Sequence, residues 1–133
     1  MNMETTQSSA DKTALVVEDN AAIRQMLVSA FLSNRVFKTC AEAENGKEGV
    51  EIARKIHPDI ITLDLSMPVM NGMEAASELR KLFPKTPIIL FTLYGEGISQ
   101  TDAAKSGVTV VLSKSTPLHS LIIIAHRLLG LPD

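Results

Sequence analysis

Five polar residues stand just after short apolar runs of this sequence: Glu18, Asp19, Asp64, Thr92 and Lys114. The three carboxylates offer hard oxygen ligands, and no Cys or His accompanies them, so the set favours Mg²⁺ or a similar ion over Zn²⁺. Mg²⁺ usually binds one or two carboxylates together with a phosphate oxygen. These residues therefore indicate phosphoryl chemistry, provided that the chain brings them together.

Among the acids, Asp64 is the candidate nucleophile. A carboxylate can form an acyl phosphate when a metal ion and a second cation offset the charge on the phosphoryl oxygens. Lys114 would supply that cation, and Thr92 would supply a hydroxyl donor. Each residue alone also has a plainer explanation: Asp19 fits a helix cap, Thr92 a strand-end turn and Lys114 a solvated surface charge. The prediction depends on their joint placement.

The elements that must position these residues follow from an alternation of apolar, β-branched runs with segments of helical period. The expected strands are 13–17, 36–41, 59–63, 88–91 and 109–112. The expected helices are 21–32, 46–56, 73–83, 95–105 and one opening at Pro117 and continuing to Leu128. The helix at 95–105 is the weakest of these predictions, because it contains few apolar residues to bury.

Repeated strand and helix units require right-handed crossovers, which give a parallel sheet with helices on both faces. We expect an α/β fold of the flavodoxin-like, doubly wound kind, with five parallel strands in the order 2-1-3-4-5. In such folds ligands bind at the carboxyl ends of the strands. Strands one and three are then neighbours, so Glu18 and Asp19 must approach Asp64. Two such charges about 4 Å apart repel by roughly 4 kcal/mol at an effective dielectric constant near 20, so the site needs a cation.

The composition of the chain limits the classes of protein to which it can belong. The chain has 133 residues, of which 45% are hydrophobic and 21% charged, as expected for one folded domain. A net charge of −2 with scattered basic residues disfavours direct nucleic-acid binding. No segment reaches the roughly 18 consecutive apolar residues of a membrane span, and the single Cys40 excludes an internal disulfide, so we expect a cytoplasmic protein. The polar segment 1–12 is expected to be a disordered leader before a domain at 13–133.

These motifs, taken in order, resemble those of the receiver domains of two-component response regulators. The matching motifs, spread over about residues 13–130, are Val17-Glu18-Asp19-Asn20, the run Asp64-Leu65-Ser66-Met67-Pro68 that continues through Met70-Asn71-Gly72, Thr92 and Lys114. Each is weak alone, but four motifs in order at strand ends are specific. The resemblance implies a phosphoprotein in which Asp64 accepts a phosphoryl group from a histidine kinase or a histidine phosphotransfer protein.

The resemblance also implies a role for each site residue. Asp19 and Asp64 would ligate Mg²⁺ directly, Glu18 would act through water, and the main-chain carbonyl of Ser66 would complete the protein ligands. Thr92 and Lys114 would hold the phosphoryl oxygens.

The chain departs from the family pattern in three ways. Val111 stands where many receiver domains carry an aromatic switch residue, and Ser115 follows the lysine where proline is common. Leu93 and Tyr94 follow Thr92, where a small residue is usual, so Leu93 would crowd the phosphoryl group and slow its loss. Leu93, Tyr94 and Val111 are the expected switch region. A cis bond before Ser115 would cost about 3 kcal/mol without proline.

The leading hypothesis is a switch that changes its protein partners, not an enzyme, although it would catalyse its own phosphorylation and dephosphorylation. The apolar surplus of Ile122, Ile123 and Ile124 in the last helix leaves two interpretations open: extra core, or a partner surface such as a homodimer contact. The output would be a downstream effector protein or an output domain.

Three alternatives remain. The segment could be the regulatory domain of a longer DNA-binding response regulator or hybrid kinase. An aspartate-nucleophile phosphohydrolase would use the same nucleophile, but it needs a second acid two residues after Asp64, where Ser66 stands. A binding module that has lost phosphorylation is opposed by the intact acidic pair Glu18 and Asp19.

Overall fold

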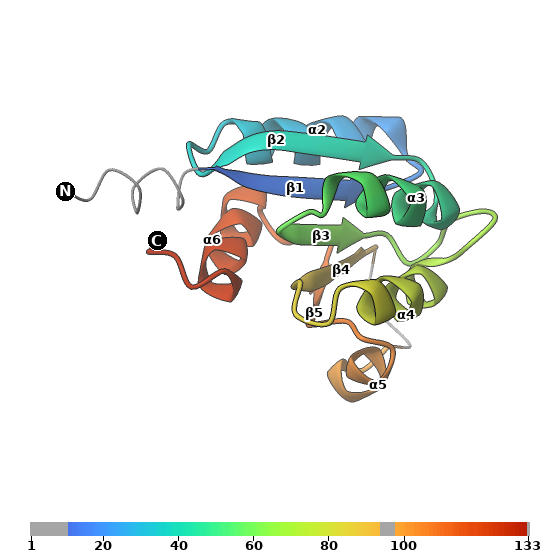
Figure 1. Ribbon diagram of the computed structural model, residues 1–133. Helices are drawn as coiled ribbons and strands as arrows, with labels where there is room; N and C mark the ends of the chain where they lie inside the picture. The colour runs from blue at the N-terminus through green and yellow to red at the C-terminus, as the bar shows by residue number, and fades with distance from the viewer. Residues whose placement is uncertain (1–10, 94–97, 133) are drawn as a thin grey trace.

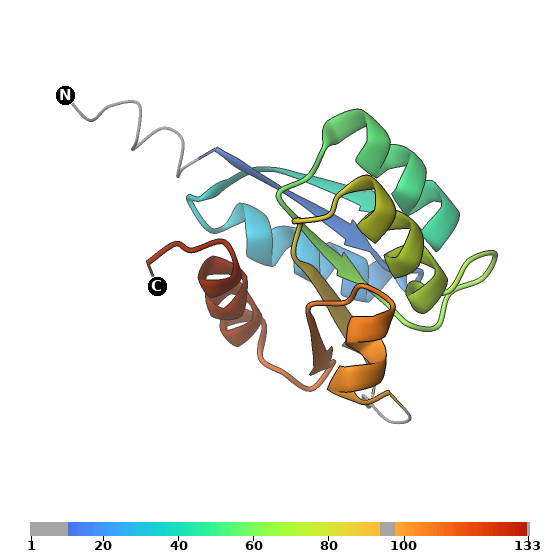
Figure 2. The same ribbon diagram turned by 60° about the horizontal axis from the view of Figure 1, so that its bottom comes forward.

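One parallel sheet organises the molecule, with helices on both of its faces (Figures 1 and 2). The structure, a computed structural model, describes residues 11–93 and 98–132. The five strands lie in the order β2-β1-β3-β4-β5, and every neighbouring pair is parallel. The predicted fold class and strand order are confirmed.

The strands are β1 (Lys12–Val17), β2 (Phe37–Ala43), β3 (Ile60–Leu63), β4 (Ile88–Thr92) and β5 (Val110–Ser113). The helices are α2 (Ala21–Leu32), α3 (Gly46–Ile56), α4 (Gly72–Leu82), α5 (Gln100–Lys105) and α6 (Leu118–Leu128). No helix within the described ranges has both the length and the apolar character needed to cross a membrane.

Two apolar layers cover the sheet. Along the central strand β1, Ala14 and Val16 face the layer formed with α2 and α6, while Leu15 and Val17 face the layer formed with α3, α4 and α5. Because β1 and β3 are buried on both faces, their sequences read as continuous apolar runs, as expected for central parallel strands. Burial of this core is what fixes the positions of the strand ends.

Asparagine caps begin the helices that lead away from three of these strand ends. The side chains of Asn20, Asn45 and Asn71 each accept a hydrogen bond from a main-chain N–H in the first turn of α2, α3 and α4. Such a cap contributes about 1 kcal/mol to stability. Because Asn20 directly follows Asp19 and is itself a cap, the acidic pair sits in a tight turn between β1 and α2.

Several element boundaries differ from the predictions. Strand β2 continues to Ala43, two residues beyond the expected end, because Glu42 and Ala43 still pair with Val16 and Val17 of β1. Strand β3 begins at Ile60, one residue late, since the Asp59 side chain instead accepts a hydrogen bond from the main-chain N–H of Thr13.

Two further predictions concern the leader and the fifth helix. Strand β1 begins at Lys12, one residue before the expected start, and residues 1–10 of the predicted leader lie outside the described residues. Helix α5 begins only at Gln100, with Ser99 as its cap. Residues 98 and 99 were predicted to be helical, and this part of the prediction is wrong. Residues 95–97 of that prediction also lie outside the described residues.

Candidate functional site

Three carboxylates meet at the carboxyl edge of the sheet. One oxygen each from Glu18, Asp19 and Asp64 lies within 4.8 Å of the others. Strands β1 and β3 are adjacent, with Val17 opposite Leu63, so the residues that follow them emerge side by side. The structure thus brings together the three acids that the sequence predicted to be neighbours.

Lys114 reaches the same place from the loop after β5. Its Nζ lies 3.0 Å from Oε1 of Glu18 and 3.2 Å from Oδ1 of Asp64. Its main-chain N–H donates to the carbonyl of Thr92 at 2.7 Å, which ties the lysine to the end of β4. The Lys114 side chain is only 12% exposed, so it is not the solvated surface charge of the plainer explanation.

An open cavity of about 550 Å³ contains these groups. The residues that line it are Glu18, Asp19, Asn20, Ile23, Asp64, Ser66, Thr92, Leu93 and Lys114. All six residues predicted to bind the metal or the phosphoryl group are among them. Asn20 and Ile23 were not predicted to line the site.

Burial dominates the electrostatics of the acids. It raises the pKa of the Glu18 carboxyl from its ordinary 4.5 to about 7; the Asp64 charge adds to this rise and the Lys114 hydrogen bond opposes it. Burial, followed by a hydrogen bond with Asp19, also raises the pKa of Asp64. For Lys114, burial acts to lower the pKa, but the two carboxylates outweigh it and the pKa is raised. The single positive charge of Lys114 therefore does not balance the negative charges of three acids. A further cation would balance them.

The donor set fits a hard divalent ion. The described residues that line the cavity offer oxygen atoms and the Lys114 amine, and they include no Cys or His. Oε1 of Glu18 is buried and accepts no hydrogen bond among the described residues, although it forms the ion pair with Lys114. Such an oxygen keeps a lone pair free for a metal-bound water, which fits the indirect role expected for Glu18.

The expected switch residues have different surroundings. Leu93 lies on the cavity wall and is 56% exposed, while Tyr94 lies outside the described residues. Val111 is half-buried in β5, and the side-chain amide of Gln100 binds both its main-chain N–H and its carbonyl at 3.2 Å. No cis peptide bond occurs among the described residues, so the bond between Lys114 and Ser115 is trans.

The apolar surplus of α6 is divided between core and surface. Ile122 is buried with Leu121 and Ala125 in the layer shared with α2. Ile123 and Ile124 are half-buried, and Ile123 lines a cleft of about 390 Å³ with residues of α2 and the turn after it. One isoleucine of the three is therefore part of the core, and the partner surface remains a prediction.

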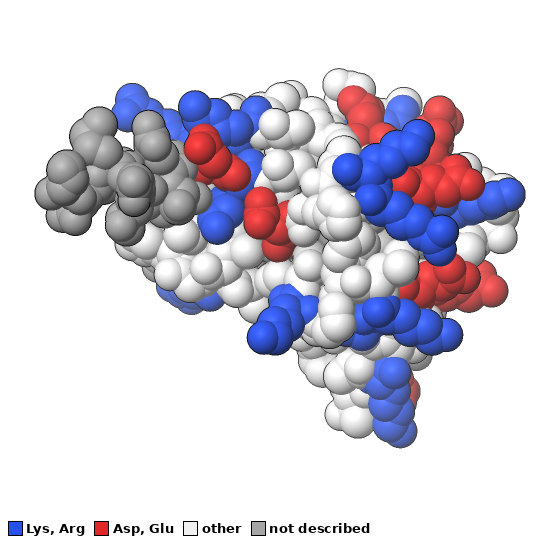
Figure 3. All heavy atoms as spheres, in the orientation of Figure 1, with Lys and Arg blue, Asp and Glu red and all other residues white. Residues whose placement is uncertain are grey.

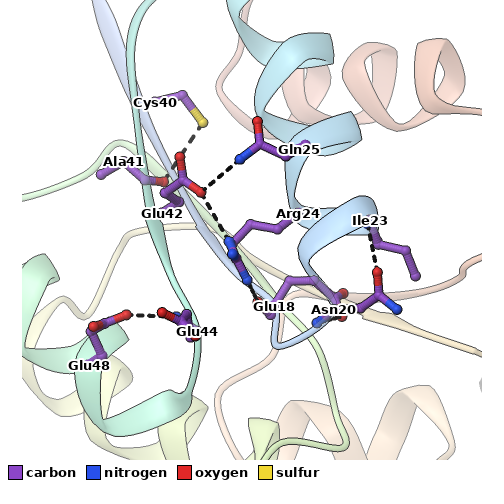
Figure 4. Close-up of polar contacts among 10 residues, drawn as sticks. All are labelled: Glu18, Asn20, Ile23, Arg24, Gln25, Cys40, Ala41, Glu42, Glu44 and Glu48. Carbon is purple, nitrogen blue, oxygen red and sulfur yellow. Dashed lines mark hydrogen bonds and ion pairs between the residues drawn. The ribbon is translucent and has the colours of Figure 1, made fainter.

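Arg24 is a residue near the site whose role was not predicted from the sequence. Its Nη1 donates to the main-chain carbonyl of Glu18 at 2.8 Å, and its Nε donates to Oε1 of Glu42 at 3.0 Å (Figure 4). The main-chain N–H of Asn20 also donates to Oε2 of Glu18, at 3.2 Å. The only signal in the sequence was the position of Arg24 in the first turns of α2, close to the acidic pair.

Charged side chains are mixed over the face that carries α3 and α4. Figure 3 shows acidic and basic groups interspersed there, without one continuous basic patch on this face.

The comparisons with known proteins agree on one family. The family model described as the response regulator receiver domain matches residues 14–126. Chemotaxis protein CheY of Thermotoga maritima is 35% identical over 96 residues, which are 72% of this chain and 79% of CheY. Regulatory protein AtoC of Escherichia coli strain K12 is 34% identical over 117 residues, which are 88% of this chain but 25% of AtoC.

Solved structures agree with this assignment. The response regulator domain of Thermotoga maritima CheB superposes with a TM-score of 0.81 at 26% identity, covering 92% of this chain and 98% of that domain. The chain thus spans nearly the whole of an isolated domain of this kind, but only about a quarter of a longer relative such as AtoC.

Proposed function

This chain belongs to the response regulator receiver domain family, and from that premise we propose that it is a phospho-accepting switch whose acceptor is Asp64. The donor is a histidine kinase or a histidine phosphotransfer protein. The observation that carries the proposal is the convergence of Asp64, two further carboxylates and Lys114 in one open cavity.

In the proposed transfer, a carboxylate oxygen of Asp64 attacks the phosphorus of the donor's phosphohistidine. A phosphorus–oxygen bond forms while the phosphorus–nitrogen bond breaks, and the released imidazole nitrogen keeps the electron pair and takes up a proton from solvent. The products are an aspartyl phosphate and a free histidine. Bound Mg²⁺ would neutralise charge on the phosphoryl oxygens.

The metal ligands in this proposal are Asp19, Asp64 and the main-chain carbonyl of Ser66, with Glu18 acting through water. Its support is the position of all four residues on the cavity wall and the all-oxygen donor set. Asp19 is exposed to the cavity opening, whereas Glu18 is buried and already held by Lys114 and Asn20. That difference favours a direct role for Asp19 and an indirect role for Glu18.

Lys114 and Thr92 receive the phosphoryl group. The Lys114 ammonium already contacts an Asp64 oxygen at 3.2 Å, so it is close enough to bind a phosphoryl oxygen attached there. Phosphorylation adds a charge of about −1.5 to −2, which the lysine and the metal balance together. The Thr92 side chain is buried at the cavity wall, where its hydroxyl can donate to the same group.

The phosphoryl signal would pass to the expected switch region, which includes Leu93 after β4 and Val111 within β5, together with Tyr94. The responding partner is a downstream effector protein or an output domain, and α6 is a candidate homodimer surface through Ile123 and Ile124. Because relatives such as AtoC extend far beyond the matched segment, the receiver domain at 13–133 could also regulate a DNA-binding or kinase domain in a longer protein.

Intact-mass measurement after incubation with Mg²⁺ and phosphoramidate tests the proposal. We expect one adduct of about 80 Da that Asp64→Asn abolishes and that Asp102→Asn, a change of an exposed aspartate in α5, leaves intact. Multiple turnover of phosphate esters would instead indicate a phosphohydrolase. Absence of any adduct would indicate a module that no longer accepts phosphate.

A further inference from the structure

Arg24 joins three parts of the molecule behind the acidic pair. Its main-chain N–H donates to the carbonyl of Asn20 at 2.9 Å, which forms the first helical hydrogen bond of α2. Its guanidinium, 12% exposed, donates to the main-chain carbonyl of Glu18 and to the carboxylate of Glu42 on β2 (Figure 4). One side chain therefore links helix α2, the turn after β1 and the edge strand β2.

The carbonyl that Arg24 binds belongs to the peptide unit between Glu18 and Asp19. A peptide unit is planar, so a hydrogen bond to its oxygen fixes the orientation of the whole unit and the direction in which Asp19 leaves the backbone. The Glu18 side chain is held separately, by Lys114 and by the N–H of Asn20. Arg24 thus acts on the backbone of the acidic pair, and Lys114 acts on its side chains.

Glu42 orients the guanidinium. The strand register places Glu42 beside Val16, and the N–H of Glu18 donates to the carbonyl of Ala43 at 3.0 Å, so β2 runs alongside the acidic pair. The Glu42 side chain is 42% exposed, so its ion pair with Arg24 contributes little to stability by itself. Its effect is geometric, because the rigid fork of an arginine can satisfy two acceptors at fixed directions.

We propose that Arg24 is a positioning residue for the cation site, which it preorganises by holding the peptide between Glu18 and Asp19. This inference rests on the function proposed above, since it assumes that the acidic pair binds Mg²⁺. Residues that orient metal ligands commonly change metal affinity by about tenfold or more when they are replaced.

Electrostatics alone predicts the opposite result. Arg24 is a cation near a site for another cation, so removing its charge should strengthen Mg²⁺ binding if charge were its only contribution. Loss of a positioning contact should weaken binding. The sign of the change therefore distinguishes the two explanations.

Calorimetric titration with Mg²⁺ measures that sign without any phosphorylation. We expect Arg24→Met to bind about tenfold more weakly than the wild type. Arg24→Lys should also bind more weakly although it keeps the charge, because one ammonium cannot span both acceptors. The matched controls, Arg35→Met at an exposed arginine and Gln25→Ala at the weaker contact to Glu42, should stay within about twofold of wild type.

Amide NMR of the metal-free proteins adds a readout that general destabilisation would not move. Resonances of Asp19 and Asn20 should shift in both Arg24 variants, while those of the distant α6 core stay in place. Unchanged or tighter Mg²⁺ binding by Arg24→Met would overturn the inference. If that variant does not fold, wild-type affinity in Arg24→Lys overturns it instead. A wild type that binds no Mg²⁺ would refute the proposed function as well.

Discussion

The ammonium of Lys114 lies 3.0 Å from Oε1 of Glu18, although 96 residues separate the two in the chain. The Glu18 side chain is almost fully buried, so the lysine is its main counter-charge in the metal-free protein. This contact joins the first and last strands in sequence across the carboxyl edge of the sheet. This contact between two residues of the site therefore also contributes to the stability of the fold.

Replacing Lys114 should destabilise the metal-free protein. We expect Lys114→Met to lower the free energy of unfolding by about 3 kcal/mol at pH 8, because the change leaves a buried carboxylate without its partner. The loss should be smaller at pH 6, where Glu18 can take up a proton instead. Urea unfolding in EDTA at both pH values measures this, with Lys105→Met, at an exposed lysine of α5, as the control. Equal losses at both pH values would contradict the explanation.

The raised pKa of Glu18 predicts how the metal-free protein responds to pH. The folded state holds this proton with a pKa of about 7, whereas the ordinary value is 4.5, so protonation favours the folded state. The contribution is fully present below pH 4.5 and is lost as the pH rises to about 7. Thermal melts in EDTA should show this component as a difference between the wild type and Glu18→Gln, which lacks it.

The same proton should compete with Mg²⁺. Each proton that must leave before the metal binds weakens the apparent affinity about tenfold per pH unit below the pKa. We therefore expect Mg²⁺ affinity to rise between pH 6 and about pH 7 and then to level off. Calorimetry in buffers of different ionisation enthalpy would count the protons released. Affinity that is constant from pH 6 to pH 8 would be inconsistent with a protonated Glu18.

Arg80 offers a stability prediction away from the site. Its guanidinium donates to the carbonyl of Gly107 at 2.7 Å and to that of Phe83 at 2.9 Å, which joins α4 to the loop before β5. Arg80→Met should lower the free energy of unfolding by about 2 kcal/mol, because the charge-assisted hydrogen bonds to these two carbonyls are lost. Mg²⁺ affinity should not change. Arg54→Met, at an exposed arginine of α3, is the control and should have little effect.

Thr62 of β3 offers a prediction of the opposite sign. Its hydroxyl is buried and has no hydrogen-bond partner among the described residues. Thr62→Val should raise the free energy of unfolding by about 1 kcal/mol, since it removes the desolvated hydroxyl and retains the branched shape. Thr39→Val, at an exposed position of β2, should have a much smaller effect. A lower midpoint in denaturant for Thr62→Val would mean that the hydroxyl has a partner.

The convergence of the acids was predictable because it depends on topology. Apolar runs identified β1 and β3, parallel pairing made them neighbours, and any residue that follows such strands must appear at the same edge. The position of Lys114 followed in the same way from β5. No side-chain contact had to be guessed for this part of the prediction.

The contact between Arg24 and Glu18 could not be predicted in the same way. It ends on a main-chain carbonyl, and such an acceptor is present at every position of a sequence. The partner on the other side, Glu42, lies in the part of β2 that was expected to be loop, because an exposed acid interrupts the apolar pattern of an edge strand. Its pairing with β1 became evident only from the register.

The side-chain amide of Gln100 has a consequence for how this protein behaves at high concentration. Strand β5 ends the sheet, and an unpaired strand edge is a template for sheet extension and aggregation between molecules. The amide occupies the N–H and carbonyl of Val111, two of the groups that an incoming strand would need. A single glutamine thereby blocks part of the open border and helps to keep separate copies from joining edge to edge.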